Sequence, residues 1–153
     1  SWIVECVKPF IDQHYRTSPQ KETSFLAGSS LGGLMTAYTG ATYPDVFGVL
    51  GIFSLASWVN DEAFLHYIAQ HPLATQTKVY LQVGTMEGNE TDQGFTSKNV
   101  NQMYLDSSLW YSQTLLRTGQ PIDTIWFRIL ADEIHHEKCW ADHFGEFLVS
   151  SFQ

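Results

Sequence analysis

A serine set between glycines is the clearest sign of chemistry in this sequence. Residues 28–32 read Gly-Ser-Ser-Leu-Gly, which fits the G-x-S-x-G pattern with Ser30 at its centre. A strand that turns directly into a helix strains the central residue, and the sequence predicts that side chains at Gly28 and Gly32 would collide. The turn presents the serine hydroxyl at a helix N-terminus, where the dipole and the free N–H of Leu31 stabilise an oxyanion. The pattern therefore predicts a nucleophile at Ser30 and an oxyanion donor at Leu31.

Two alternatives compete with this interpretation. Ser29 also carries a hydroxyl, but it lacks glycines at the required spacing. Glycine-rich turns between a strand and a helix also occur where backbones pack closely or bind phosphate. The predicted strand before the motif and the predicted helix after it favour the nucleophile over both alternatives.

A serine nucleophile needs a base, and this chain has six histidines. In the strand–turn–helix setting of this motif the chain order is serine, acid, then histidine. Three histidines precede the last predicted strand and are interpreted as unrelated to the base: His14, His66 and His71. His143 falls inside the last predicted helix. The base is therefore predicted to be His135 or His136, in the loop 132–136.

The base needs an acid to orient it, and the loop after the third predicted strand is rich in carboxylates. Glu87 lies closest to the end of that strand, while Glu90 and Asp92 follow in the same loop. Asp61, after the second predicted strand, is an outside candidate. Any of the four can be an ordinary solvated carboxylate, and position favours Glu87.

The elements that must position these residues alternate along the chain. Short apolar or β-branched runs predict strands at residues 24–27, 46–53, 78–83 and 124–130. Helical spacing, caps and terminal glycine or proline predict helices at residues 3–11, 34–42, 61–70, 99–117 and 137–152. This alternation predicts one α/β domain over residues 1–153, with a mostly parallel sheet and helices on both faces. Functional groups are then expected beyond the C-terminal ends of the strands.

Composition narrows the classes of function. The 153 residues are 44% hydrophobic and 16% charged, which suits one folded domain. The formal net charge of −8 argues against nucleic acid or an anionic membrane as partner. No apolar run approaches the roughly 18 residues of a membrane span. Cys6 and Cys139 are interpreted as free thiols of a reducing compartment, which favours the cytoplasm and otherwise leaves localisation open.

Five segments of the chain carry a resemblance to a known family: residues 9–16, 27–34, 47–58, 83–88 and 135–140. Together they resemble the esterase D-like or "putative esterase" family of α/β-hydrolases, which includes enterochelin esterases, feruloyl esterases and mycolyltransferases. The resemblance extends over nearly the whole chain and implies the α/β-hydrolase fold. It supports Glu87 as the acid, and the family's His-x-x-x-x-Trp spacing selects His135 over His136. It also makes Trp58 and Trp140 candidates for the substrate pocket.

Two departures from the family accompany this resemblance. Members usually have Gly just before the catalytic His, where this chain has Glu133 and Ile134, so a tilted loop or a narrower pocket is expected. The family's first strands, and the loop that gives the second oxyanion N–H, lie before the helix with which this chain begins. We therefore expect the C-terminal half of the domain, about four strands, with an apolar edge at residues 24–27. A homo-oligomer or a missing N-terminal half would cover that edge.

These interpretations together predict a serine esterase that cleaves a small-molecule carboxylic ester through an acyl-enzyme, with no metal or organic cofactor. The resemblance implies short-chain acyl esters, siderophore lactones or feruloylated sugars as substrates. The arginines number three (Arg16, Arg117 and Arg128), which favours simple esters over anionic siderophores. Two alternatives remain: an acyltransferase of the same family, and a non-catalytic hydrolase-like module for binding or assembly.

Overall fold

The computed structural model describes residues 1–88 and 99–152, and in this part of the chain it contains one parallel sheet. Its strands are β1 (Phe25–Ser29), β2 (Val49–Phe53), β3 (Lys78–Met86) and β4 (Ile125–Ile134), which lie side by side in chain order. Each neighbouring pair is parallel, so every connection must cross over a face of the sheet. The predicted α/β class is confirmed.

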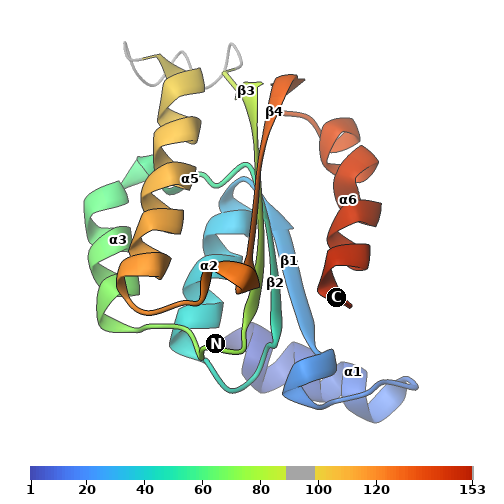
Figure 1. Cartoon of the computed structure of the whole chain (residues 1–153). Helices are drawn as coiled ribbons and strands as arrows, with labels where there is room; N and C mark the ends of the chain where they lie inside the picture. Colours follow the sequence, from blue (N-terminus) through green and yellow to red (C-terminus); the bar gives the residue numbers. More distant parts are fainter. Residues whose placement is uncertain (89–98, 153) are drawn as a thin grey trace.

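Helices cover both faces of this sheet (Figure 1). The main helices are α2 (Leu31–Thr42), α3 (Asp61–Gln70), α5 (Val100–Arg117) and α6 (Glu137–Ser151). The first three lie on one face, whereas α6 lies on the other. A π-helical turn (Ile3–Val7) and α1 (Lys8–His14) precede β1 and lie at the lower end of the sheet in Figure 1. The C-terminal ends of the strands thus point away from α1.

The core consists of two layers separated by the sheet. β2 is buried along its whole length because helices lie on both of its faces. Leu50 and Ile52 belong to the apolar cluster beneath α2, α3 and α5, whereas Val49 and Phe53 pack with Phe147 of α6. Strands buried on both faces have continuous apolar sequences, which is why residues 46–53 stand out in the chain.

The end of β4 differs from the prediction. The strand continues to Ile134 rather than stopping at residue 130. Near its end Asp132 has a φ of +62°, and its N–H donates a hydrogen bond to Oγ1 of Thr85 on β3. This contact between neighbouring strands holds the irregular segment in the sheet. His135 therefore follows a strand directly instead of lying in a free loop.

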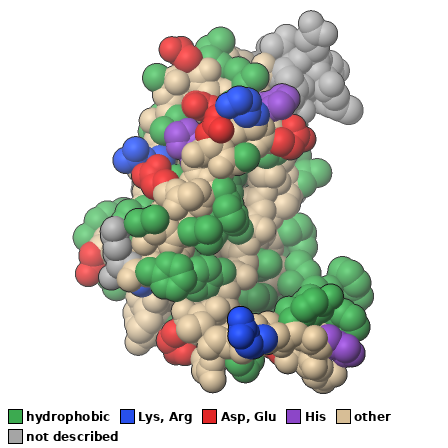
Figure 2. All heavy atoms as spheres, turned by 90° about the vertical axis from the view of Figure 1, so that its right-hand side faces the viewer, with side chains coloured by type: hydrophobic (Ala, Val, Ile, Leu, Met, Phe, Trp, Pro, Cys, Tyr) green, Lys and Arg blue, Asp and Glu red, His purple; other side chains and the backbone are tan. Residues whose placement is uncertain are grey.

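β1 forms one edge of the sheet, as the sequence predicts. Among the described residues it pairs with β2 alone. Figure 2 shows hydrophobic side chains gathered over the middle of the face that carries α6, and the exposed side chains of this helix include Phe144, Leu148 and Val149. Within the described part of the chain, no helix is both long and apolar enough to cross a bilayer.

Candidate active site

Ser30 occupies the sharp turn between β1 and α2. Its φ of +57° and ψ of −122° lie outside the regions that residues with a side chain normally adopt. The turn is held because the N–H of Ser30 donates to the carbonyl of Phe53 at 2.8 Å. Leu31 is the first residue of α2, where backbone N–H groups lack an acceptor within the helix. The strained strand-to-helix turn that the sequence predicts is present.

The two glycines of the motif differ in what surrounds them. A β-carbon at Gly28 would overlap the backbone carbonyl of Gly32, so a side chain there is excluded. A β-carbon at Gly32 would meet nothing within 4 Å. The prediction that both positions exclude side chains is therefore wrong for Gly32, because its carbonyl, not its Cα substituent, faces Gly28. The second tight position is Gly33, where a β-carbon would lie 3.2 Å from the carbonyl oxygen of Phe53.

Three predicted side chains meet at the C-terminal ends of the strands. Nε2 of His135 lies 3.0 Å from Oγ of Ser30, and its Nδ1 lies 2.7 Å from Oε2 of Glu87. Ser30 follows β1, Glu87 follows β3 and His135 follows β4, so three strands position the group. The side chain of His135 is 12% exposed and that of Glu87 only 1%. A hydroxyl, an imidazole and a carboxylate in this order form the arrangement of a Ser-His-acid triad.

The buried carboxylate of Glu87 is surrounded by donors. Its Oε1 accepts from the backbone N–H of Gly84 at 2.6 Å and from Oγ of Ser54 at 2.7 Å, while Oε2 faces His135. An ionised carboxylate can only accept hydrogen bonds, and burying one without partners costs several kcal/mol. The surroundings of Glu87 therefore suit an ionised acid.

Two residues that the sequence did not single out for a role contact the triad. Ser54 binds Glu87 and also accepts a hydrogen bond from Nε1 of Trp140 at 2.8 Å. The hydroxyl of Tyr104, on α5, lies 3.5 Å from Nε2 of His135, and the two rings have centroids 4.8 Å apart. Ser54 directly follows the C-terminal end of β2, and that position is the signal in the sequence that could have found it. Tyr104 has no comparable signal.

The competing candidates lie away from the triad or outside the described residues. His136 is 57% exposed, and its Nδ1 accepts a backbone N–H in the first turn of α6. Asp61 accepts hydrogen bonds from two serine side chains at the start of α3. Ser29 lies in β1, before the turn. Glu90 and Asp92 belong to residues 89–98, which the structure does not describe.

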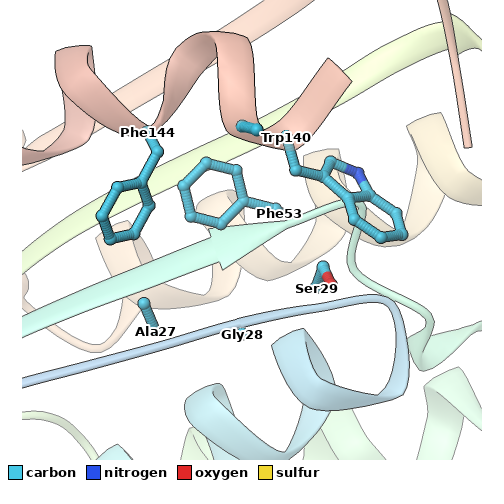
Figure 3. Close-up of a pocket in the computed structure, with 7 residues that line it drawn as sticks. Ala27, Gly28, Ser29, Phe53, Trp140 and Phe144 are labelled. Atoms are coloured by element: carbon cyan, nitrogen blue, oxygen red, sulfur yellow. The ribbon is translucent and has the colours of Figure 1, made fainter. Parts of the chain in front are cut away.

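A cavity of about 380 Å³ opens beside the turn, between β1 and α6. In Figure 3, Trp140 and Phe144 project from α6 toward the side chain of Phe53, and β1 passes below them. Trp140 therefore lines this cavity, and its role in a substrate pocket stays a prediction. Trp58 is not among the lining residues and packs against Tyr104 instead, with ring centroids 5.8 Å apart.

The residues that flank His135 do not displace it. Ile134 is half exposed, and His135 still reaches both Ser30 and Glu87. Ile134 pairs with Met86 of β3 beyond an irregularity in the pairing of the two strands, and His135 directly follows it. Whether Ile134 narrows the pocket stays a prediction.

Two titratable groups near His135 are coupled to each other. A hydrogen bond from the Cys139 thiol, more than any other contact, holds the pKa of the Glu133 carboxyl below its ordinary value. The same hydrogen bond is the largest cause that raises the pKa of Cys139, and burial adds to it. Cys139 is partly exposed and not in a disulfide. Within the described residues, no three His, Cys, Asp or Glu side chains are grouped to hold a metal ion.

Comparison with known proteins gives matches in both sequence and structure. A family model described as "Putative esterase" matches residues 1–112, a range that contains Ser30 and Glu87. The uncharacterised protein YbbA of Bacillus subtilis (strain 168) is 24% identical over 136 residues, which cover 89% of this chain and 52% of that protein. This chain thus spans about half the length of its curated relative.

Solved structures are similar over nearly the whole chain. An enterobactin esterase from Shigella flexneri matches with a TM-score of 0.77 and 19% identity, over 99% of this chain and 37% of that one. A ferulic acid esterase from Anaeromyces mucronatus, in complex with ferulic acid, matches with a TM-score of 0.69 and 17% identity, over 99% of this chain and 54% of that one. At these identities the likeness shows the fold, a partial α/β-hydrolase fold of four strands with helices on both faces.

Proposed function

The chain belongs to the "Putative esterase" family, and from this premise we propose that it is a serine hydrolase of carboxylic esters. The observation that carries the proposal is the unbroken line from Oγ of Ser30 through His135 to Glu87, with steps of 3.0 and 2.7 Å. The base lies beyond the residues that the family model matches, so geometry and family membership support the proposal separately. The esterase names of the similar structures agree with it.

In the first half of the proposed reaction the ester acylates the serine. Oγ of Ser30 attacks the ester carbonyl carbon while Nε2 of His135 takes the hydroxyl proton. Glu87 accepts the Nδ1–H of the imidazole, which fixes the tautomer and stabilises the imidazolium as it forms. The carbonyl oxygen becomes an oxyanion, to which the N–H of Leu31 donates. The C–O bond to the alcohol then breaks, and His135 returns the proton to the leaving alcohol.

In the second half water releases the acid. His135 removes a proton from a water molecule, which attacks the acyl carbon of the ester now formed with Ser30. The second oxyanion then collapses and the bond from the acyl carbon to Oγ of Ser30 breaks. Oγ recovers its proton from the imidazolium of His135. The net reaction is ester plus water giving acid plus alcohol. An alcohol in place of water would give the acyltransferase variant.

The cavity between β1 and α6 adjoins the turn through Gly28 and Ser29, although neither Ser30 nor His135 lines it. If substrate binds there, the cavity favours an apolar acyl or alcohol group. Its lining is largely aromatic and small aliphatic, with Phe53, Trp140 and Phe144 as the large side chains. No Lys or Arg is among the lining residues, so the cavity does not favour an anionic siderophore. We therefore propose neutral short-chain or aromatic esters as the first substrates to try; the ferulic acid in the complex of a similar structure is an aromatic acid of the kind that the second group would release.

The proposal is tested by reaction with a fluorophosphonate probe, which phosphonylates an activated serine. Mass spectrometry of the digested protein should find the label on Ser30. Ser30→Ala should take up none, whereas Ser29→Ala should still carry the label on Ser30. A folded protein that takes up no label, or a Ser30→Ala variant that is labelled as well as the wild type, would favour the non-catalytic module instead.

A further inference from the structure

We propose that Ser54 and Trp140 are positioning residues of the triad, which fix the carboxylate of Glu87 so that Oε2 faces the imidazole. This inference rests on the proposed esterase function and assigns a role to two residues that do not themselves touch the reacting ester carbonyl. Its basis is a chain of hydrogen bonds from Trp140 Nε1 to Ser54 Oγ, at 2.8 Å, and from Ser54 Oγ to Glu87 Oε1, at 2.7 Å.

These two hydrogen bonds can run in one direction only, from the indole of Trp140 to the hydroxyl of Ser54 and from that hydroxyl to the carboxylate of Glu87. The indole Nε1–H of Trp140 can donate but not accept, and an ionised carboxylate can accept but not donate. The hydroxyl of Ser54 must therefore accept from Trp140 and use its single proton on Glu87. A hydroxyl whose proton is committed in this way cannot rotate toward another acceptor. The result is a fixed donor on Oε1, which leaves Oε2 for the Nδ1–H of His135.

The backbone of Ser54 is also fixed, in a strained conformation, next to Glu87. Ser54 is fully buried and has a φ of +51°, a conformation that residues with a side chain rarely adopt. Its N–H donates to the carbonyl of Gln82 on β3 at 2.7 Å. The other described non-glycine residues with positive φ are Ser30, the nucleophile, and Asp132, three residues before His135. Backbone strain in the described part of the chain is thus confined to the surroundings of the triad, which is where functional strain is found.

Trp140 contacts the proposed base, His135, directly and the proposed acid, Glu87, through Ser54. Its ring lies edge-on to the imidazole of His135, with centroids 5.0 Å apart and planes at 87°. Figure 3 shows the indole reaching from α6 over the strands. One side chain of α6 therefore restrains the acid through Ser54 and the ring of the base directly, so the position of α6 sets the relative orientation of the two.

The test compares two variants, singly and together. Ser54→Ala removes one of the two donors to Oε1 of Glu87 and leaves the backbone N–H of Gly84, whereas Trp140→Phe removes the indole N–H while keeping an apolar ring. For Ser54→Ala we expect kcat for a neutral aryl ester to fall about 10–100-fold with KM nearly unchanged, since a hydrogen bond to a charged group is lost. The proton resonance of the His135 Nδ1–H should shift or broaden. Ser150→Ala, which removes a buried hydroxyl bonded to a backbone carbonyl on α6, is the matched control and should change neither.

The double variant separates positioning from mere stabilisation. Ser54→Ala leaves the partly buried N–H of Trp140 without its acceptor, and such a group lowers stability. Adding Trp140→Phe removes that N–H, so the melting temperature should recover while kcat stays low. If kcat recovers together with the melting temperature, Ser54 acts through stability alone and the inference is overturned. Ser54→Gly, which tolerates a positive φ, provides a second variant without the hydroxyl should Ser54→Ala fold poorly.

Failure of the inference can be told apart from failure of the proposed function. A wild-type protein that neither hydrolyses esters nor reacts with fluorophosphonate contradicts the esterase proposal. In an active wild type, a Ser54→Ala variant whose kcat stays within about threefold and whose His135 resonance is unmoved contradicts the positioning role.

Discussion

At the scale of single residues, His135 and His136 are neighbours in sequence with different surroundings. His135 is nearly buried between Ser30 and Glu87, whereas His136 is mostly exposed and caps α6. We expect His135→Gln to lower the rate of fluorophosphonate labelling about 10⁴-fold or more, because an amide can accept a hydrogen bond from Ser30 but is too weak a base to take its proton. His136→Asn keeps an acceptor for the cap and should keep the rate. Stopped-flow or gel-based labelling measures both, and equal losses in the two variants would contradict the assignment of the base.

Cys139, on α6, provides a pH-dependent measurement through its hydrogen bond to Glu133. The hydrogen bond to Glu133, and then burial, raise the pKa of the thiol, so less of it is thiolate at a given pH and it reacts more slowly with an alkylating agent. In Glu133→Gln the charged acceptor is gone. The pKa of Cys139 should fall, and the midpoint of iodoacetamide alkylation against pH should move to lower pH.

The control for this measurement is Glu137→Gln, which removes a carboxylate that is 84% exposed and is not a cause of the raised pKa. Mass spectrometry of the peptide that contains Cys139 gives the rates. A midpoint that moves equally in both variants would point to the general negative charge rather than to the hydrogen bond.

The three residues that the sequence offered for the triad meet in the structure, and their catalytic roles stay predictions. Ser30 lies in a glycine-flanked turn and Glu87 follows a strand, whereas local pattern left His135 and His136 open and the family resemblance selected His135. The contacts of Ser54 and Tyr104 depend on which side chains approach them from distant elements. Trp140 reaches Ser54 from 86 residues further along the chain, and no local pattern reports such a contact.

At the scale of elements, the turn between β1 and α2 depends on close backbone contact at one glycine. Gly28→Ala should disrupt the turn, because the added methyl group would overlap the carbonyl of Gly32. We expect this variant to lose several kcal/mol of stability, if it folds at all, and to lose labelling of Ser30. Gly32→Ala is the matched change, since its methyl group meets nothing within 4 Å, and it should remain folded and be labelled. Circular dichroism, used to follow thermal unfolding, compares the stability of the two variants. Equal destabilisation would contradict the expectation that only a side chain at Gly28 overlaps the backbone.

The sequence located the elements better than it located their ends. All four strands and the helices between them were predicted in the right order, because buried strands and amphipathic helices have different apolar periods. The end of β4 was missed by four residues, since the prediction stopped at residue 130 and the strand reaches Ile134. The polar residues Asp132 and Glu133 read as a loop, and the hydrogen bond from Asp132 to Thr85 that keeps them in the sheet joins residues 47 apart.

At the scale of the whole molecule, the net charge of −8 should influence which substrates arrive fastest. A negative field repels anionic esters and attracts cationic ones, and salt screens both effects, with a Debye length of about 30 Å at 0.01 M and about 3 Å at 1 M. Raising the salt over this range should therefore lower kcat/KM for a cationic ester and raise it for an anionic one. A neutral ester of the same size is the control and should change little. The same salt response for all three substrates would mean that the overall charge does not steer them.

The contact between Ser30 and His135 also joins the two edges of the sheet, since Ser30 follows β1 and His135 follows β4. Fraying at either edge would pull the hydroxyl and the ring apart before the interior unfolds. Probe uptake at residue 30 would then decline earlier in a denaturant titration than the far-ultraviolet signal of the helices. The rate of labelling would thus report whether all four strands are in place, without an added dye or tag.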